Sequence, residues 1–379
     1  MIFEISEEQK MIRDAARDFA QTELKPGVIE RDENQIFPAE QIRKLGELGF
    51  LGMMVDPKYN GSGLDSISYV LAMEEFSKID ASASVVVSVN NSLVCFGLEK
   101  YGSEDQKEKY LKPLAAGEMI GAFCLSEPEA GSDATSQRTI AEDKGDYYLL
   151  NGTKNWITNG DTASVYLVIA QTHPEKGSRG INVLILEKGM EGFSVGPKEN
   201  KMGIRGSDTH SLLFNDVKVP KQNRIGEDGF GFKFAMQTLD GGRIGIAAQA
   251  LGIASGAFEL ALNYAQERKA FGKPIAELQA ISFKLADMAT DIEAARLLVM
   301  KAAWLKDQEL PYAKYASMAK LKASEVAMKT TIEAVQIHGG YGYVKEYHVE
   351  RLMRDAKVTQ IYEGTSEIQR LVIAREILK

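Results

Sequence analysis

A glutamate beside a glycine near the C-terminus is the residue whose surroundings best suit acid–base chemistry. In the segment IYEGTSEIQR (361–370), Glu363 precedes Gly364, and Thr365 or Ser366 can cap the helix that begins there. A carboxylate on such a loop, with apolar and aromatic neighbours, can be partly desolvated, which raises its pKa toward the range of a general base. An ordinary helix start has the same pattern, so this segment by itself leaves both interpretations open.

Two segments in the middle of the chain place polar groups next to glycine or tryptophan. FCLSEPEAGSD (123–133) offers serine hydroxyls and backbone N–H groups around a turn-forming glycine. WITNG (156–160) places one of only two tryptophans beside polar residues in a strand-like context. A plain loop and a core tryptophan explain each segment singly, whereas their occurrence together favours a binding site.

Two segments of the C-terminal third suit either a binding site or the end of a helix. ERKAFGKPI (267–275) has three cations and a phenylalanine just after a predicted helix, which fits a solvated helix end as well as an anion site. QIHGGYGY (336–343) ends another predicted helix with paired glycines and two tyrosines. Helix termination explains one glycine, and the second with the tyrosines suggests a chain lying against something flat.

The elements that must position these segments change in type along the chain, and the first third is mostly helical. Ser6 with Gln9, and Ser103 with Gln106, form capping-box patterns at two predicted helix starts. Helical periodicity continues to about residue 120.

Residues 121–228 change to short apolar runs separated by glycine and polar residues. The dipeptide Asn151-Gly152 predicts a hairpin turn after the first run. Without helical segments between them, the runs favour an antiparallel barrel or sandwich over a doubly wound sheet. The predicted strands contain YYLL (147–150), YLVIA (166–170), INVLILE (181–187) and SLLF (211–214).

After residue 229 the helical pattern returns and predicts a four-helix bundle. The helix expected over 240–266 is rich in small residues on several faces, which permits close approach of another backbone or of a flat ligand and predicts a central place in the bundle. Apolar residues at the spacing of a helix–helix seam are Leu285, Met288, Ile292, Ala295, Val299 and Ala302.

Length and composition describe a globular protein rather than a small disulfide-rich module. The 379 residues suggest two or three domains, and 44% apolar residues can bury a sizeable core. The net charge of −8 is the reverse of a nucleic-acid footprint. The N-terminus has acidic residues where a signal peptide has cations, and no unbroken apolar run has membrane-spanning length. We therefore expect a cytoplasmic protein that binds neither nucleic acid nor membrane.

The remaining signatures of metal and nucleotide sites are missing from the sequence. Cys95 and Cys124 form no CxxC pair and are expected to pack in the core, and the four histidines lack zinc spacing, so no metal is predicted. Neither GxGxxG nor a P-loop is present, so a nucleotide cofactor must be held in another way. No GxSxG elbow supports hydrolase chemistry.

Taken in order, the segments FCLSEPEAGSD, WITNG, LDGGR (239–243), ERKAFGK, QIHGGYG and IYEGTSEIQR resemble the acyl-CoA dehydrogenase family across the whole chain. The resemblance implies an α+β protein with a helical N-terminal domain (1–120), a β-barrel middle domain (121–228) and a C-terminal helical bundle (229–379). It also implies an FAD enzyme that assembles as a homotetramer, a dimer of dimers.

The chemistry implied by this resemblance is α,β-dehydrogenation of an acyl-CoA thioester to a trans-2-enoyl-CoA. Glu363 occupies the position of the base that takes the α-proton, and flavin N5 accepts the β-hydride. The backbone N–H of the base and a ribityl hydroxyl polarise the thioester oxygen, as in an oxyanion hole. Isovaleryl and long-chain members carry the base near the LDxxR arginine instead, where this chain has Gly242. Because glycine cannot act as a base, Glu363 is favoured.

Matching motif by motif also implies the residues that contact substrate and cofactor. Substrate contacts are expected from Ser132, Asp240, Arg243 and Gly364. Arg268 and Gln279 are expected to reach the FAD of a neighbouring subunit, where Arg268 gives its pyrophosphate a cationic partner. The cofactor contacts are Phe123, Leu125, Ser126, Ser132, Trp156, Ile157, Thr158, Arg268, Phe271, Gln279, Gln336, Gly339, Gly340, Thr365 and Glu367.

Substrate class and partners follow from finer similarities. SVNNSL (88–93) and TSEIQR (365–370) are most similar to short-chain, butyryl-type members, whereas medium-chain members tend to have glutamine where Glu367 stands. Electrons are expected to leave through an electron transfer flavoprotein. A branched-chain dehydrogenase for isobutyryl- or 2-methylbutyryl-CoA, an oxidase-like enzyme, and a scaffold that binds CoA esters or flavin without turnover remain alternatives, as does the direction of the reaction.

Overall fold

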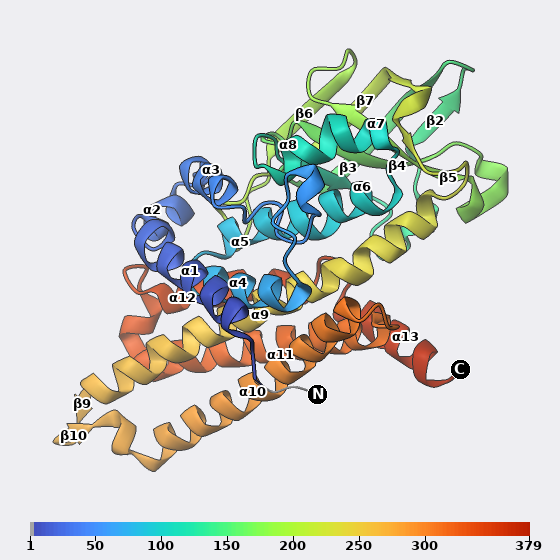
Figure 1. The fold of residues 1–379 in the computed structure, drawn as a ribbon. Helices are drawn as coiled ribbons and strands as arrows, with labels where there is room; N and C mark the ends of the chain where they lie inside the picture. The colour runs from blue at the N-terminus through green and yellow to red at the C-terminus, as the bar shows by residue number, and fades with distance from the viewer. Residues whose placement is uncertain (1–3) are drawn as a thin grey trace.

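The structure, a computed structural model, describes residues 4–379 and consists of helices on either side of one β region in the sequence (Figure 1). Both predicted capping boxes are present, at Ser6 with Gln9 and at Ser103 with Gln106. The helices before the sheet are α1 (Glu7–Phe19), α2 (Val28–Glu33), α3 (Ala39–Glu47), α4 (Ser66–Ile79), α5 (Ala81–Ser88), α6 (Phe96–Tyr101), α7 (Glu104–Gln106) and α8 (Lys112–Ala115), with a π-helical stretch, η3 (Val89–Cys95), between α5 and α6.

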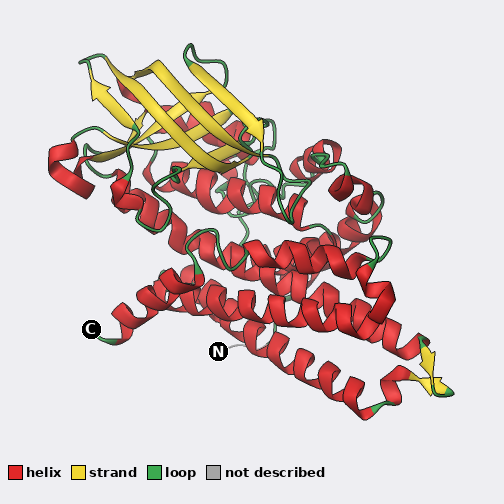
Figure 2. Ribbon diagram, turned by 180° about the vertical axis from the view of Figure 1, so that it is seen from behind, coloured by secondary structure: helices red, strands yellow, loops and turns green. Residues whose placement is uncertain are grey.

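The β region is one eight-stranded sheet in which most neighbours are antiparallel. The pairing order is β6-β7-β3-β2-β4-β5-β8, and β1 pairs in parallel with β4. The strands are β1 (Gly121–Cys124), β2 (Ile140–Asp143), β3 (Tyr147–Thr158), β4 (Val165–Gln171), β5 (Ile181–Glu187), β6 (Phe193–Lys198), β7 (Thr209–Pro220) and β8 (Arg224–Ile225). Six of them, β1 to β5 and β7, contribute side chains to one shared core, so the sheet curves around its own interior (Figure 2).

Strand β4 lies between two cores. Its residues Tyr166 and Val168 face the interior of the curved sheet, whereas Leu167 and Ile169 face the helices. Because side chains alternate along a strand, an entirely apolar strand such as this one is buried on both faces.

The turn predicted at Asn151-Gly152 is wrong. Both residues lie inside β3, where the register with β7 shifts between Leu150 and Gly152. Gly152 has φ 141°, and Asn151 exchanges side-chain hydrogen bonds of 2.9 and 2.8 Å with Asp216 of β7. The pair forms a β-bulge rather than a turn because strand pairing continues on both sides of it.

Helices return after the sheet and form the predicted bundle around one central helix. They are α9 (Gly231–Glu267), α10 (Gln279–Asp307), α11 (Ala313–His338), α12 (His348–Val358) and α13 (Ser366–Ile377), with a short hairpin of β9 (Lys269–Ala270) and β10 (Lys273–Pro274) after α9. The hairpin lies at the end of the bundle opposite the sheet (Figures 1 and 2).

Small residues let α9 approach α4 closely, as the composition of α9 predicts. A side chain at Gly252 would overlap the carbonyl oxygen of Glu74, and one at Gly256 that of Lys78. At Gly252 and Gly256 the close partner is therefore the backbone of α4. All six residues of the predicted α10 seam are buried, as are both cysteines.

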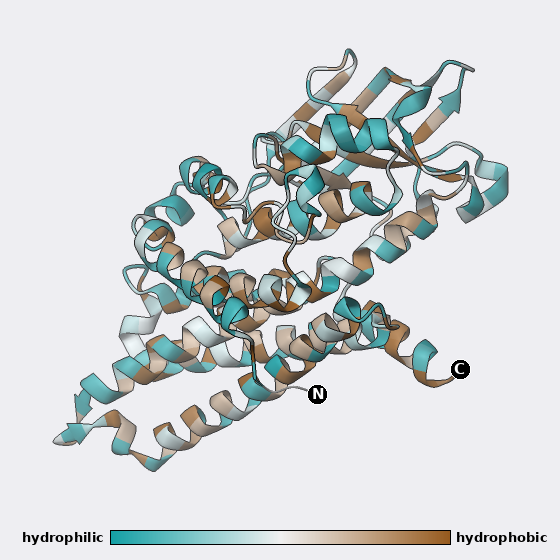
Figure 3. Ribbon diagram, viewed as in Figure 1, coloured by the Kyte–Doolittle hydropathy of each residue, from teal (hydrophilic) through white to brown (hydrophobic). Residues whose placement is uncertain are grey.

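Two helical stretches, Ala81–Tyr101 and Gly231–Glu267, are long and apolar enough to cross a membrane by length and composition. In the fold, 94% and 83% of their most apolar windows are buried by the rest of the chain. Hydrophilic residues predominate on outer helices such as α2 and α3 (Figure 3). These two stretches thus have the burial of core helices.

Candidate active site

Glu363 lies in a tight turn between α12 and α13. Its φ is 50° and that of Gly364 is 94°, so two consecutive residues adopt the left-handed region. Thr365 then caps α13 by accepting a hydrogen bond of 3.3 Å from the Ile368 amide, as the sequence predicts for this helix start. A non-glycine residue in this region costs on the order of 1–3 kcal/mol, so the surrounding structure must hold the turn in place.

Two buried side chains hold the carbonyl groups of this turn. Lys320 of α11 donates a hydrogen bond from Nζ to the Gly364 carbonyl at 2.6 Å. Gln369 of α13 donates from Nε2 to the Gly364 carbonyl at 2.9 Å and to the Glu363 carbonyl at 3.2 Å. Both side chains are fully buried. Lys320 was not singled out by the sequence, because a lysine inside a helical pattern is usually exposed. Gln369 lies in the segment 361–370, but its pattern gave it no role.

The carboxylate of Glu363 is buried and available for proton transfer. Burial raises its pKa to about 7, although the positive charges of Lys320 and Arg243 act in the opposite direction. The raised pKa is in the direction that the loop position predicts. Its Oε2 atom has no hydrogen-bond partner among the described residues. A carboxylate with this pKa and no partner suits a general base near neutral pH.

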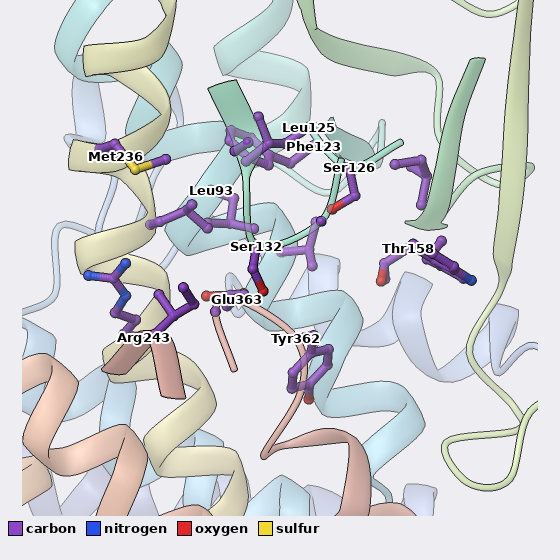
Figure 4. A pocket seen from close by; sticks show the side chains of 18 of the residues that line it. Leu93, Phe123, Leu125, Ser126, Ser132, Thr158, Met236, Arg243, Tyr362 and Glu363 are labelled. Atoms are coloured by element: carbon purple, nitrogen blue, oxygen red, sulfur yellow. The ribbon is translucent and has the colours of Figure 1, made fainter. Parts of the chain in front are cut away.

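Glu363 lines a partly open cavity of about 270 Å³ and also an adjoining cavity of about 410 Å³. Figure 4 shows Arg243 and Met236 reaching the first cavity from α9 and Ser132 reaching it from the loop after β1. Residues of the sequence-predicted site that line the first cavity are Phe123, Leu125, Ser126, Ser132, Trp156, Ile157, Thr158, Arg243, Glu363 and Gly364, and Thr365 lines the second.

The indole of Trp156 lies at both cavities and not in the core. Its side chain is 54% exposed and its φ is 57°, at a register shift between Lys154 and Ile157. The core interpretation of this tryptophan is therefore wrong. The bulge turns the indole out of the alternation of β3, so that an apolar ring remains uncovered beside the polar Thr158.

A buried ion pair ties the loop 123–133 to the same strand. Lys154, whose side chain is fully buried, donates to Glu127 at 2.7 Å and to the Leu125 carbonyl at 2.9 Å. Glu127 also accepts hydrogen bonds from the backbone amides of Arg138 and Thr139. The pair thereby fixes the loop that carries Ser126 and Ser132 relative to Trp156.

Arg243 and Asp240 lie one turn apart on α9 and form an ion pair of 2.6 Å. Arg243 is buried and lines the first cavity, and its Nε atom has no hydrogen-bond partner in the described part of the chain. Burial raises the pKa of Asp240 and lowers that of Arg243, each partly offset by the other. An arginine with a free buried donor can bind an acceptor that enters the cavity.

Most of the other predicted cofactor residues lie near the hairpin and the helix ends beside it. Arg268, Gly339 and Gly340 line a separate cavity of about 490 Å³. Arg268 directly precedes β9, in the hairpin at the end of the bundle opposite the sheet (Figure 1). Phe271, at the hairpin tip, is 92% exposed. Gln279 begins α10, Gln336 lies near the end of α11, and Glu367 is in the first turn of α13. One copy of the chain therefore does not bring the residues near the hairpin together with Trp156, whereas Glu367 lies two residues from Thr365, which lines the second cavity.

Several lining residues had no signal in the sequence motifs. Lys201 lines the second cavity from the loop after β6, and burial lowers its pKa to about 8. Apolar walls come from helices whose periodicity indicates only a buried face. They include Val85, Val89, Leu93, Phe232, Met236 and Leu239. Within residues 4–379, no group of three or more His, Cys, Asp or Glu side chains is arranged to hold a metal ion.

Comparison with known protein families finds three domain types in the same order along the chain as the helical, β and helical regions. The N-terminal, middle and C-terminal domains of acyl-CoA dehydrogenases match residues 6–118, 122–217 and 229–378. The chain belongs to the acyl-CoA dehydrogenase family.

Individual members of the acyl-CoA dehydrogenase family match over the full length. The chain is 50% identical over 379 residues to a short-chain specific acyl-CoA dehydrogenase of Clostridium acetobutylicum, covering 100% of both proteins. The structure of butyryl-CoA dehydrogenase from Megasphaera elsdenii matches with a TM-score of 0.99, 51% identity and 100% coverage of both chains. A chain in a structure of the electron transferring flavoprotein of Acidaminococcus fermentans matches with a TM-score of 0.99, 52% identity and 100% coverage of both.

These similarities confirm the predicted family, the α+β fold with a β region between helical regions, and an oxidoreductase of the acyl-CoA dehydrogenase type.

Proposed function

We propose that this protein is a short-chain acyl-CoA dehydrogenase in which Glu363 removes the α-proton of a butyryl-CoA-like thioester. The observation that supports this most directly is the buried, unpartnered carboxylate of Glu363 at the cavity, with a pKa raised by burial to about 7. Similarity to short-chain specific and butyryl-CoA dehydrogenases supports the substrate class.

The α C–H group beside a thioester is a weak acid. The site must therefore increase its acidity for the proton to be transferred. The amide N–H of Glu363 has no hydrogen-bond partner among the described residues and is available to the thioester oxygen. Donation to that oxygen stabilises the enolate that develops as the α-proton moves to the Glu363 carboxylate. One residue then both takes the proton and supports the resulting charge.

FAD fits the residues at the two adjoining cavities. A planar flavin ring needs a flat apolar wall with polar groups at its edge, and the uncovered Trp156 indole, Thr158 and Ser126 supply these. Bound there, FAD supplies the acceptor for the two electrons and the hydrogen that leave the β-carbon, which completes the double bond. Trp156, Thr158 and Ser126 are the residues that would hold the ring.

We further propose that Arg268 and its neighbours complete the cofactor site of another subunit in a homotetramer. Their distance from Trp156 within one chain and the exposure of Phe271 support this. Arg268→Ala is expected to lower FAD retention, whereas Lys269→Ala, the adjacent cation in the same hairpin, leaves FAD retention unchanged. Absorbance of the flavin after gel filtration measures this, and equal retention by both variants contradicts the shared site.

Asp240, Arg243 and Ser132 are proposed to contact the CoA part of the substrate, and the three regions 1–120, 121–228 and 229–379 to be its domains. We also propose that electrons pass to an electron transfer flavoprotein, as the match to a structure bearing that name suggests, and that the protein is cytoplasmic.

Anaerobic titration of the flavin absorbance with acyl-CoAs tests the activity. Butyryl-CoA is expected to bleach the flavin at lower concentrations than longer or branched acyl-CoAs, and stronger bleaching by isobutyryl- or 2-methylbutyryl-CoA supports the branched-chain alternative. Rapid reoxidation by oxygen supports the oxidase-like alternative. A yellow protein that no acyl-CoA reduces is a scaffold and contradicts the proposed activity.

Glu363→Gln tests the base itself. The variant should bind FAD and butyryl-CoA while the rate of flavin reduction falls by about 10³-fold or more, the upper range for loss of a general base. Glu376→Gln, a control on α13 whose carboxylate pairs with Lys379, should reduce its flavin at the wild-type rate. Normal reduction by Glu363→Gln excludes Glu363 as the base.

A further inference from the structure

Lys320 is a fully buried lysine close to the proposed base, yet it forms no ion pair within 4 Å in the described residues. Its ammonium group has one hydrogen-bond acceptor, the carbonyl oxygen of Gly364 at 2.6 Å. A buried ammonium with a single neutral acceptor is costly. A neutral donor could satisfy the same carbonyl at lower cost, so packing alone gives no reason for a positive charge at this position.

The carbonyl that Lys320 holds belongs to the turn that aims the base. Gly364 is the second of the two left-handed residues, and a Cβ at this position would lie 2.8 Å from Gln369 Nε2. With Gln369 on the same two carbonyl groups, Lys320 closes the turn from the side of α11. The Glu363 amide and carboxylate are both left without partners in the described part of the chain.

We propose that Lys320 is a positioning residue that holds the Gly364 carbonyl and keeps Glu363 as a carboxylate at the cavity. The inference rests on the proposed role of Glu363 as the base. Lys320 touches neither the cavity nor the Glu363 carboxylate, so it acts on the reaction only through the turn and through its charge.

The charges around Glu363 support the second part of this role. Arg243 on α9 and Lys320 on α11 are the cations that face it, and Tyr69 on α4 and Tyr362 are neutral phenols whose pKa values burial raises. Lys320 itself faces Glu363, Arg243 and Glu367. Burial lowers the pKa of Lys320 to about 7. At neutral pH the Lys320 side chain therefore carries its charge in only part of the molecules. Removal of that charge leaves Glu363 with one facing cation, Arg243, so a larger fraction of Glu363 should be protonated.

The test compares two substitutions at this position with a matched control on the same helix. Lys320→Met removes donor and charge, and Lys320→Gln keeps a donor without the charge. Lys322→Met removes a lysine that pairs with Asp291 of α10 at 3.0 Å, on another side of α11. For each FAD-loaded variant, the rate of flavin reduction at saturating butyryl-CoA is measured anaerobically from pH 6 to 9.5, together with the half-saturating butyryl-CoA concentration.

Lys320→Met is expected to move the pH midpoint of flavin reduction up by at most about one unit and to slow reduction at pH 7 by up to about fivefold. The half-saturating concentration should change less than about twofold, because Lys320 does not line the cavity. Lys320→Gln should show the same midpoint shift with a plateau at high pH closer to wild type. Lys322→Met should match wild type in every respect.

A wild-type pH midpoint in FAD-loaded Lys320→Met overturns the inference. A half-saturating butyryl-CoA concentration that rises by the same factor as the reduction rate falls also overturns it. If Lys320→Met does not fold, the pH midpoint of flavin reduction in Lys320→Gln tests the inference in the same way. Failure of the proposed function can be told apart from failure of this inference. If Glu363 is not the base, Glu363→Gln reduces its flavin normally although Lys320 is intact.

Discussion

The carboxylate of Glu363 occupies the space that a side chain at Gly242 would fill. A Cβ built on Gly242 overlaps Oε2 of Glu363 and lies 2.7 Å from Cδ2 of Leu93. The two positions come from α9 and from the turn before α13, which are 121 residues apart in sequence, and they meet at one wall of the cavity. Glycine at 242 is therefore what leaves room for a glutamate at 363.

Gly242→Ala is expected to slow flavin reduction by butyryl-CoA by at least about tenfold, because the added methyl group displaces the Glu363 carboxylate. Alanine is favoured over glycine inside a helix by roughly 1 kcal/mol, so α9 itself should not be weakened. Gly241→Ala is the matched control, since its Cβ would meet nothing closer than 3.9 Å. Equal reduction rates in the two variants would show that Glu363 tolerates displacement.

The rate of flavin reduction should depend on pH through the ionisation of Glu363. Its folded-state pKa of about 7 means that the carboxylate, the form able to accept a proton, becomes the major form only above pH 7. We expect kcat/KM for butyryl-CoA to rise between pH 6 and 8 and then level off. A base with an ordinary glutamate pKa would give a flat profile over this range.

Leu93→Ala should shift the preference among substrates toward longer acyl chains. Leu93 is buried, lines the cavity and lies beside Gly242, so its truncation lengthens the space next to the base. The ratio of kcat/KM for hexanoyl-CoA to that for butyryl-CoA is expected to rise about tenfold. Leu98→Ala truncates a buried leucine outside the cavity lining and should lower stability without changing the ratio. An unchanged ratio in Leu93→Ala argues against this wall as a limit on chain length.

Lys154→Met should destabilise the protein by about 3–5 kcal/mol, because it leaves the buried Glu127 carboxylate without its cation. Urea unfolding measures the loss, and the double variant Lys154→Met/Glu127→Leu should recover part of it. Lys144→Met breaks an exposed pair with Glu142 and should cost less than about 0.5 kcal/mol. Equal losses in the two lysine variants contradict a structural role for the buried pair.

Local patterns were sufficient for much of the fold. The capping boxes at Ser6 and Ser103 place helix starts because their hydrogen bonds join residues only three apart. The α10 seam follows from apolar periodicity, and the four apolar runs of the middle region all lie in strands. The pattern at Asn151-Gly152 misled, because the same dipeptide serves a turn or a bulge depending on whether strand pairing continues.

The sequence by itself determined which residues are the candidates for chemistry, since Glu363, Trp156, Ser132 and Arg243 stand in segments whose types and order are those of a known family. Only the tertiary structure decided what surrounds them. Burial, the pKa of Glu363, the uncovered face of Trp156 and the donors from Lys320 and Gln369 depend on contacts between residues far apart in the chain. Desolvation and packing are properties of such contacts, and no local pattern encodes them.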